Sequence, residues 1–298
     1  MNTSENKYAI ITPAHNEAAF LPRVIDSISR QTTRPSKWII LDDRSTDETW
    51  SIISKAAWEH TFIEPVRKTG EADRRVGANV VHLFNLGWQK LPAGIPFVVK
   101  LDADILLPEN YFEMLLSRFC EDPKLGIASG KTYNYQKGKL ILERIADSHV
   151  TGGCKTYRTR CLEDIGGLIP MHGWDILDVV QARWKGWRAE SFRDLRLFHL
   201  RITGYGHGMV KAQIVYGGSY YAMRAHPLFV LGKSIYRAWE RPYLFGLLIF
   251  IGYLMAALRR EERLANPELA RFMRKEQLNR LFGRTWSQEE LIPRRFKE

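Results

Sequence analysis

The stretch PFVVKLDAD, residues 96–104, decides the fold, because it joins an apolar run directly to two carboxylates. The run Pro96–Leu101 is apolar at nearly every position, which indicates a strand buried on both faces. Asp102 and Asp104 follow at positions i and i+2, so a turn of the backbone there would aim both side chains into one site. Surface turns also contain pairs of Asp residues, so the triplet Asp102-Ala103-Asp104 gains its meaning from the segments around it.

The first hundred residues alternate apolar runs with segments of helical periodicity. This order predicts an α/β fold, in which helices cover the faces of a parallel sheet. Ligands of such sheets bind beside the carboxyl ends of the strands. The predicted strands are Tyr8–Thr12, Lys37–Leu41 and Pro96–Leu101, and the predicted helices are Phe20–Arg30, a segment capped by Ser45 or Thr46 that ends near Ala57, and Val76–Gln89.

Polar clusters follow the first two strands as well as the third. His15-Asn16-Glu17 enters the first helix, whose free N–H groups favour anions, although a plain capped loop would contain the same residues. Asp42-Asp43 places acceptors where a nucleobase or ribose could donate hydrogen bonds. Helix capping by Ser45 or Asp47 explains the polar residues after this pair but not the pair itself. A nucleotide diphosphate at this edge would be repelled unless a hard cation, Mg²⁺ or Mn²⁺, bridged it to Asp104.

Three segments together, ITPAHNE (11–17), LDDRSTD (41–47) and LDAD (101–104), resemble the family 2 glycosyltransferases in their order and in their places at strand ends. The resemblance covers residues 7 to about 200. It implies the GT-A nucleotide-diphospho-sugar transferase fold, which has a Rossmann-like and mostly parallel sheet. It also implies an inverting transfer of sugar from a nucleotide-sugar, with Mn²⁺ or Mg²⁺ as cofactor. The first strand is not followed by GxGxxG, which counts against a dinucleotide cofactor.

The resemblance also implies which residues bind the nucleotide-sugar. Within that set, Asp43 would accept a hydrogen bond from the base and Asp102 would contact the ribose. Asp104 would hold the metal, and His199 is a second candidate ligand for which a core histidine is the alternative. The positions on the donor side are Pro13, His15, Glu17, Asp43, Arg75, Gly77, Asp102 and Ala103.

The second half of the resemblance concerns the acceptor and the catalytic base. Asp175 takes the position of the usual Asp, because Gly186 stands eleven residues after it as the family pattern requires. The preceding residue is Trp174 where the family usually has Glu, so Asp178, nearly one turn further on, is the fallback for the base. An N-cap of its own helix is the alternative role for Asp175. The expected acceptor-side positions are Gly152, Gly153 and Trp174.

The C-terminal third has a different composition. Residues 200–298 contain seventeen Lys and Arg against eight Asp and Glu, which places nine of the eleven surplus positive charges there. Tyr243–Leu258 is uncharged and slightly shorter than the ~20 residues of a spanning helix. A buried helix and a single span are alternatives, but Trp239 and the flanking Arg residues favour an interfacial or re-entrant hairpin. We therefore expect a GT-A domain over residues 1–200 and a helical, basic, membrane-associated extension over residues 201–298.

The resemblance agrees with a membrane location, since relatives that build polysaccharides or glycolipids act on lipid-linked acceptors. We expect a UDP-, GDP- or dTDP-sugar donor, a lipid-linked or glycan acceptor, and a peripheral or monotopic protein at the cytoplasmic face of the cell membrane. The three cysteines form no CxxC pair, which fits a reducing compartment. The N-terminus lacks the basic and apolar regions of a signal peptide.

Three other functions remain open at this point. The basic tail suggests a nucleic-acid-binding protein, but its apolar stretch and the lack of a zinc finger or RNP motif make nucleic acid an unlikely partner. A sugar nucleotidyltransferase would carry a Gly-rich basic loop after the first strand, where Pro13–Glu17 stands instead. A membrane-attached, catalytically inactive scaffold is suggested only by Trp174 in place of Glu.

Overall fold

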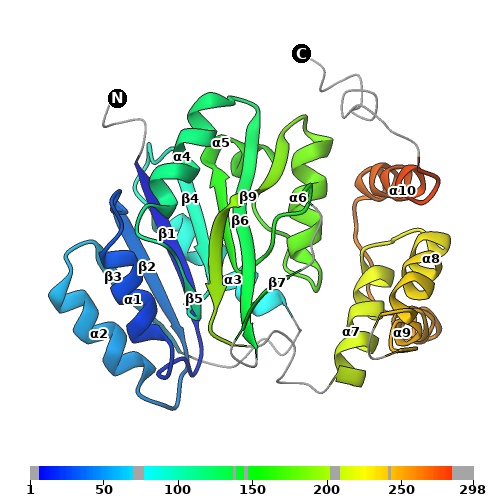
Figure 1. Cartoon of the computed structure of the whole chain (residues 1–298), viewed down its shortest axis with the longest axis horizontal. Helices are drawn as coiled ribbons and strands as arrows, with labels where there is room; N and C mark the ends of the chain where they lie inside the picture. Colours follow the sequence, from blue (N-terminus) through cyan, green and yellow to red (C-terminus); the bar gives the residue numbers. More distant parts are fainter. Residues whose placement is uncertain are drawn as a thin grey trace. The chain divides into compact units, whose positions relative to one another are not determined.

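The computed structural model describes residues 7–69, 77–136, 139–143, 147–201, 209–240 and 243–283. The chain divides into two compact units. The first consists of residues 1–182 and 187–202, and the second of residues 183–186 and 203–298. The first unit is an α/β domain, and the second is built from helices in its described part (Figure 1).

A nine-stranded sheet forms the centre of the first unit within the described residues, in the order β3-β2-β1-β4-β8-β6-β9-β5, with β7 paired to β6. Strands β3, β2, β1 and β4 are parallel. Strand β8 runs antiparallel between β4 and β6, and β9 is parallel to β6. The strands are β1 (Tyr8–Ala14), β2 (Lys37–Asp43), β3 (Ile63–Lys68), β4 (Phe97–Leu101), β5 (Ile105–Leu106), β6 (Leu125–Gln136), β7 (Lys139–Leu142), β8 (Cys154–Arg158) and β9 (Arg188–His199).

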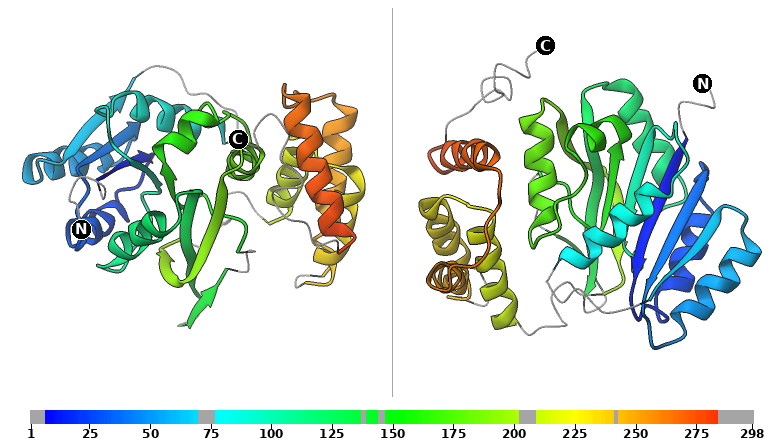
Figure 2. Two further views of the ribbon diagram at one scale, coloured as in Figure 1. Left: turned by 90° about the horizontal axis from the view of Figure 1, so that it is seen from above. Right: turned by 180° about the vertical axis from the view of Figure 1, so that it is seen from behind.

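Helices cover both faces of this sheet (Figures 1 and 2). Alternate residues of β2 enter opposite cores: Trp38 and Ile40 face α1, α2 and α4, whereas Ile39 and Leu41 face α3, α5 and α6. Both faces are therefore apolar, which is why the strand is a continuous apolar run in the sequence. The helices are α1 (Leu21–Ser29), α2 (Thr49–Glu59), α3 (Ala78–Gln89), α4 (Tyr111–Glu121), α5 (Thr159–Asp164) and α6 (Trp174–Trp184).

The parallel register brings the polar segments to one edge of the sheet. Ala14 at the end of β1 lies opposite Asp42 of β2, and Ile11 lies opposite Lys100 of β4. The chain therefore leaves β1, β2 and β4 on the same side, as the apolar runs predict. The prediction that β4 is the third strand is wrong, because β3 precedes it. Strand β3 is half exposed and contains Pro65, so it lacks the apolar run of a central strand.

The predicted start of the second helix is also wrong. Helix α2 begins at Thr49 and its N-cap residue, Glu48, makes no side-chain cap hydrogen bond. The hydroxyl of Ser45 accepts instead from the backbone N–H of Asn16 at 2.9 Å. The polar residues after β2 thus fix the loop after β1, a contact between segments that a local capping rule does not anticipate.

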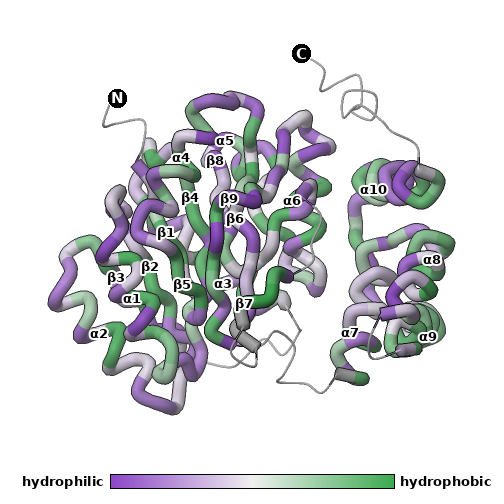
Figure 3. Tube along the Cα trace, in the orientation of Figure 1, coloured by the Kyte–Doolittle hydropathy of each residue, from purple (hydrophilic) through white to green (hydrophobic). Residues whose placement is uncertain are grey.

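The second unit contains helices α7 (Met209–Ala222), α8 (Pro227–Ala238), α9 (Leu247–Leu258) and α10 (Pro267–Leu281). Helix α9 has a hydrophobic colour along much of its length in Figure 3. Its residue Gly252 lies so close to the carbonyl of Ile214 in α7 that a side chain there would collide with the backbone. In the part of the chain that the structure describes, every helix is too short or too polar to cross a membrane.

Candidate active site

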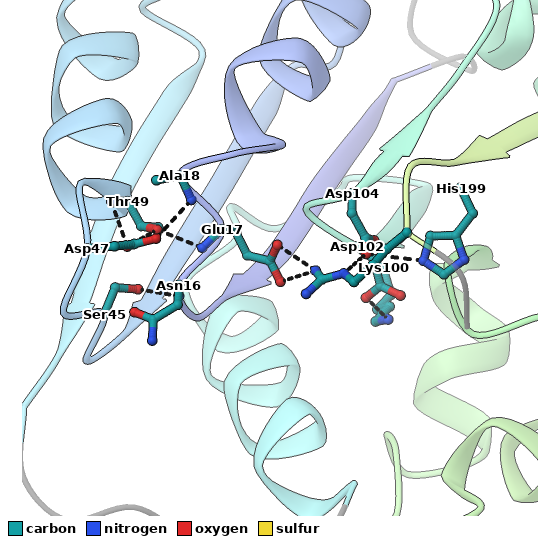
Figure 4. A network of polar contacts seen from close by, with 11 residues as sticks. Asn16, Glu17, Ala18, Ser45, Asp47, Thr49, Lys100, Asp102, Asp104 and His199 are labelled. Atoms are coloured by element: carbon teal, nitrogen blue, oxygen red, sulfur yellow. Dashed lines mark hydrogen bonds and ion pairs between the residues drawn. The ribbon is translucent and has the colours of Figure 1, made fainter. Parts of the chain in front are cut away.

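The loop after β1 is held by side chains that follow β2 (Figure 4). The hydroxyls of Ser45 and Thr49 accept from the backbone N–H groups of Asn16 and Glu17, at 2.9 and 2.8 Å. Asp47 accepts in turn from the Thr49 hydroxyl at 2.5 Å. Asn16 has a φ of 55°, a left-handed conformation that Asn tolerates better than most residues. The segment LDDRSTD therefore fixes the backbone from which Glu17 projects toward Asp104.

Asp43, the predicted acceptor for the base, is buried at the end of β2. Its carboxylate pairs with Arg44 at 2.5 Å and accepts from the side-chain amide of Asn79. The His15 ring nitrogen Nδ1 lies 2.6 Å from the Asp43 backbone carbonyl. The structure thus brings His15 and Asp43 together and adds Asn79 of α3, which sequence reasoning missed.

The other predicted donor residues stand at the ends of β1 and α3. Pro13 lies in β1 opposite Leu41 of β2. Gly77 precedes α3 with a φ of 79°, and a Cβ there would lie 3.2 Å from the His172 Cα. A left-handed backbone and this close approach together require glycine at position 77. The prediction for Arg75 lies outside the described residues.

Asp104 accepts two hydrogen bonds at one carboxylate oxygen. Its Oδ2 lies 3.1 Å from Nε2 of His199 and 2.8 Å from Nε of Arg201. The same guanidinium donates to both carboxylate oxygens of Glu17 at 2.5 Å. Burial alone would raise the pKa of Asp104, but the hydrogen bonds and charges of His199 and Arg201 outweigh burial and lower it. Figure 4 shows Glu17, Asp104 and His199 converging from three separate segments.

Asp102 belongs to a second, adjacent arrangement. Its carboxylate pairs with Lys100 of β4, and its backbone N–H donates to the carbonyl of Gly153 at 2.8 Å. Lys100 also donates to the carbonyl of Gly152 at 2.7 Å. Desolvation raises the pKa of Asp102, against the opposing charge of Lys100. Ala103 between the two aspartates is buried, and so is Asp104, whereas the side chain of Asp102 is partly exposed.

The predicted acceptor-side residues meet at Gly152. A Cβ on Gly152 would lie 3.4 Å from the Cβ of Asp175 and from the ring of Trp174. The Trp174 ring is buried, with the Nζ atoms of Lys100 and Lys155 at 5.2 and 5.4 Å from its centroid. Asp175 is the second residue of α6, so it lies inside the helix and does not cap it. Lys100 therefore connects the Asp102 side of the site to the Asp175 side.

Asp178 lies one turn further into α6 and is 1% exposed. Its two oxygens accept from Lys155 at 2.7 and 2.8 Å, and one of them accepts from the Tyr157 hydroxyl at 2.5 Å. Lys155 also donates to the backbone carbonyl of Asp175 at 2.6 Å. Burial raises the pKa of Asp178 and lowers that of Lys155, so each group depends on the other for its charge.

A sequence model described as Glycosyl transferase family 2 matches residues 9–148. This stretch contains the loop after β1, the loop after β2 and the Asp102–Asp104 triplet. Residues 9–148 belong to glycosyl transferase family 2. The expected family is thereby confirmed, and the matched residues include Glu17 and Asp104, the two carboxylates that Arg201 joins.

A curated relative of this family-2 domain is "Glycosyltransferase GlyA" of Streptococcus pneumoniae serotype 4, 22% identical over 254 residues. The alignment covers 82% of this chain and 33% of the relative, so the chain spans about a third of that protein's length. Since the identity is low, the likeness adds to the family assignment and leaves the substrates of this chain to be proposed.

Solved structures confirm the expected GT-A fold. "Mannosyltransferase PcManGT from Pyrobaculum calidifontis in complex with GDP-Man and Mn²⁺" superposes with a TM-score of 0.56 at 19% identity, covering 96% of this chain and 78% of that one. "S. aureus TarS 1-349 in complex with UDP" has a TM-score of 0.53 at 15% identity, covering 95% of this chain and 73% of that one.

The side chains at Asp104 fit the divalent cation that the family resemblance leads us to expect. The described residues contain no group of three or more His, Cys, Asp and Glu placed to hold a metal. Mg²⁺ is nevertheless often bound by only one or two carboxylates of the protein, with substrate phosphates and waters as its other ligands. Asp104 provides such a carboxylate, and His199 meets it at Oδ2. The carboxylate of Asp104 suits Mn²⁺ or Mg²⁺, and the imidazole of His199 is a common ligand of transition-metal ions.

The buried cations of the first unit were not anticipated from the sequence. Lys100 lies inside β4, where its neighbours are apolar, and Lys155 lies inside β8, a strand with several polar residues. A charged residue in an otherwise apolar strand is itself a signal, because buried charges are paired. The only sequence feature that could have pointed to Arg201 is its position two residues after His199, a candidate metal ligand.

Replacing Asp104 with Asn should lower the pKa of the His199 imidazole in the metal-free protein. Burial alone would lower this pKa below the ordinary 6.5, but the hydrogen bond and charge of Asp104 outweigh burial and raise it. NMR titration of the imidazole measures the value. The control Asp26→Asn, which breaks only an exposed pair with Arg30, should leave it unchanged. An equal pKa in wild type and Asp104→Asn would contradict the pairing.

Proposed function

We propose that this protein is an inverting glycosyltransferase that moves a sugar from a nucleotide-diphosphate-sugar to an acceptor hydroxyl. The observation that carries this proposal is the juxtaposition of two arrangements at the carboxyl edge of the sheet. His199 lies against one carboxylate oxygen of Asp104, and Lys100 links the neighbouring Asp102 to Gly152, against which Asp175 packs. A donor site and a candidate base thus share one supporting network.

Donor binding would use the residues at the ends of β1, β2 and β4. Asp43 would accept from the base, Asp102 would contact the ribose, and Asp104 with His199 would hold Mn²⁺ or Mg²⁺. When bound, the cation would stabilise negative charge on the departing diphosphate. The solved relatives in complex with GDP-Man and Mn²⁺ and with UDP support a nucleotide-sugar donor in the set of UDP-, GDP- and dTDP-sugars.

Asp175 is the proposed general base that removes the acceptor proton as the oxygen attacks C1 of the sugar. Its side chain is half buried beside Gly152, where an added Cβ would lie 3.4 Å from the Cβ of Asp175. Asp178 is less suited to this role, because Lys155 and Tyr157 already occupy both of its oxygens. Lys155 would instead position Asp175 through the backbone carbonyl of that residue.

Asp175→Asn should reduce turnover by about 10²–10⁴-fold, since the amide cannot accept the proton. Donor binding should be nearly unchanged, because no proposed donor contact involves Asp175. Single-turnover transfer measures the first quantity, and calorimetric titration with the nucleotide measures the second. Asp194→Asn, which changes only an exposed pair with Arg118, is the matched control. Near-wild-type turnover in Asp175→Asn would overturn the assignment of the base.

Removal of divalent metal with EDTA should abolish transfer, and Mn²⁺ or Mg²⁺ should restore it. A cognate nucleotide-sugar should also raise the melting temperature more strongly with Mn²⁺ than without it, because the metal should lower the Kd of the nucleotide. A ligand at 100 times its Kd stabilises the folded state by about 2.7 kcal/mol. A thermal scan with UDP-, GDP- and dTDP-sugars makes this comparison and identifies the nucleotide. Full turnover in a metal-free assay is incompatible with the proposed metal role.

The second unit is the proposed attachment to the cytoplasmic face of the membrane, where a lipid-linked acceptor of polysaccharide or glycolipid synthesis would be presented. Leu247, Ile251, Leu254 and Leu258 recur along α9 at helical spacing and are all exposed. Trp239 at the end of α8 is 80% exposed. An apolar stripe beside an amphipathic aromatic residue suits an interfacial helix better than one in water.

The charge of the same region supports an anionic membrane. Arg259 and Arg260 directly follow α9, and both are exposed. Basic side chains near an anionic surface each contribute about 1 kcal/mol to binding. The apolar stripe and the arginines together account for a peripheral or monotopic attachment that requires no spanning helix.

The double substitution Ile251→Glu/Leu254→Glu should weaken binding to anionic vesicles at least tenfold, because it puts two charges into the apolar stripe. Flotation with vesicles of phosphatidylglycerol and phosphatidylcholine measures the bound fraction. Trp58→Glu changes an exposed aromatic on α2 of the first unit and serves as the control. A wild-type protein that stays in the supernatant with vesicles at low salt would contradict the attachment.

A further inference from the structure

Within the described residues, Arg201 is the one cation that joins the carboxylates of Glu17 and Asp104. Its Nε donates to Asp104 Oδ2 at 2.8 Å, and its terminal nitrogen donates to both oxygens of Glu17 at 2.5 Å. The guanidinium also lies 5.0 Å from the centroid of the Phe20 ring. These contacts reach Glu17 across 184 positions of the sequence and Asp104 across 97.

The local charges explain why a cation is held there. Glu17, Asp102 and Asp104 lie near enough that their negative charges repel one another. Lys100 pairs with Asp102 alone among these three. Arg201 balances the charge of Glu17 and, together with His199, that of Asp104. Like charges a few ångströms apart repel one another, so the carboxylates disfavour a structure without this guanidinium.

The same position is the one that a divalent cation would need. Arg201 and His199 both contact Oδ2 of Asp104, so a metal bound to that oxygen and to His199 has to compete with the guanidinium. A bound divalent ion and an adjacent guanidinium also repel each other. Arg201 is 44% exposed at its side chain, so it has room to turn away from Asp104.

We propose that Arg201 makes metal binding conditional on the nucleotide, by exchanging Asp104 for the donor diphosphate when the metal enters. A guanidinium binds phosphate oxygens as well as carboxylates, in the same two-pronged geometry. The incoming diphosphate therefore gives Arg201 a new anionic partner at the moment when Asp104 becomes a metal ligand. This inference rests on the proposed function, since it requires a metal at Asp104 and a nucleotide diphosphate beside it.

The exchange has a measurable thermodynamic consequence. Without nucleotide, the guanidinium opposes the metal, and with nucleotide it helps to bind the diphosphate. The nucleotide therefore raises the affinity for metal, and by linkage the metal raises the affinity for nucleotide by the same factor. Couplings of this kind are commonly about 5- to 150-fold.

The test is Mn²⁺ binding measured by electron paramagnetic resonance of the free ion, with and without saturating UDP or GDP. Arg201→Ala should bind Mn²⁺ alone about tenfold more tightly than wild type, in the middle of the usual range of such couplings. The enhancement of Mn²⁺ affinity by the nucleotide should shrink by a similar factor. Arg201→Lys, which keeps a charge but loses the two-pronged geometry, should lie between them. Arg30→Ala, at an exposed residue directly after α1 that pairs with Asp26, should behave as wild type.

The outcomes separate this inference from the proposed function. If wild type binds Mn²⁺ in a nucleotide-dependent way and Arg201→Ala shows the same affinities and the same coupling, the role of Arg201 is refuted while the metal site stands. If wild type and every variant fail to bind Mn²⁺ with either nucleotide, the metal site itself is refuted. Circular dichroism verifies folding, and Arg201→Gln replaces Arg201→Ala if the alanine variant is unfolded.

Discussion

The carboxyl edge of the sheet is shaped by the mutual repulsion of carboxylates placed at the ends of parallel strands. The parallel register of β1, β2 and β4 brings Glu17, Asp43 and Asp102–Asp104 to one edge, and that proximity is useful only if cations balance it. The protein supplies a cation for each carboxylate group: Arg44 for Asp43, Lys100 for Asp102, and Arg201 for Glu17 and Asp104. The geometry of the edge is therefore set as much by basic as by acidic residues.

The residues around Trp174, on the proposed acceptor side, also contain charges that need partners, and these charges are buried. Lys100 and Lys155 both lie near the face of Trp174, at a position where the resemblance leads one to expect Glu. A ring attracts ammonium groups but cannot neutralise them. Asp102 and Asp178 supply that charge instead, each from a different element. The substitution at 174 is thus compatible with an intact network and leaves Asp175 free of the ion pairs that occupy Asp178.

The sequence predicted the parts of this structure that depend on local pattern. The strands of the parallel half, the helices between them and the placement of the carboxylates followed from apolar runs and from the segments that resemble family 2 glycosyltransferases. Strand β3 was not predicted, because one of its faces is exposed and Pro65 interrupts the apolar pattern. The start of α2 was misplaced because Ser45 bonds to the loop of Asn16 across the sheet edge. Arg201 could not be paired with Glu17 from the sequence, because no periodicity links positions so far apart.

The second unit illustrates how close packing on one side of a helix determines what the other side presents. Gly217 of α7 and Gly252 of α9 allow the two backbones to approach so closely that added side chains would collide with main-chain atoms. This contact fixes the rotation of α9, with Ile249, Tyr253 and Ala256 buried. A helix that is apolar all round then has to expose its remaining apolar residues, here the stripe that ends at Leu258. Because a helix in water could have carried polar residues on that face at no cost to its packing, the apolar stripe supports the proposed attachment to a lipid surface.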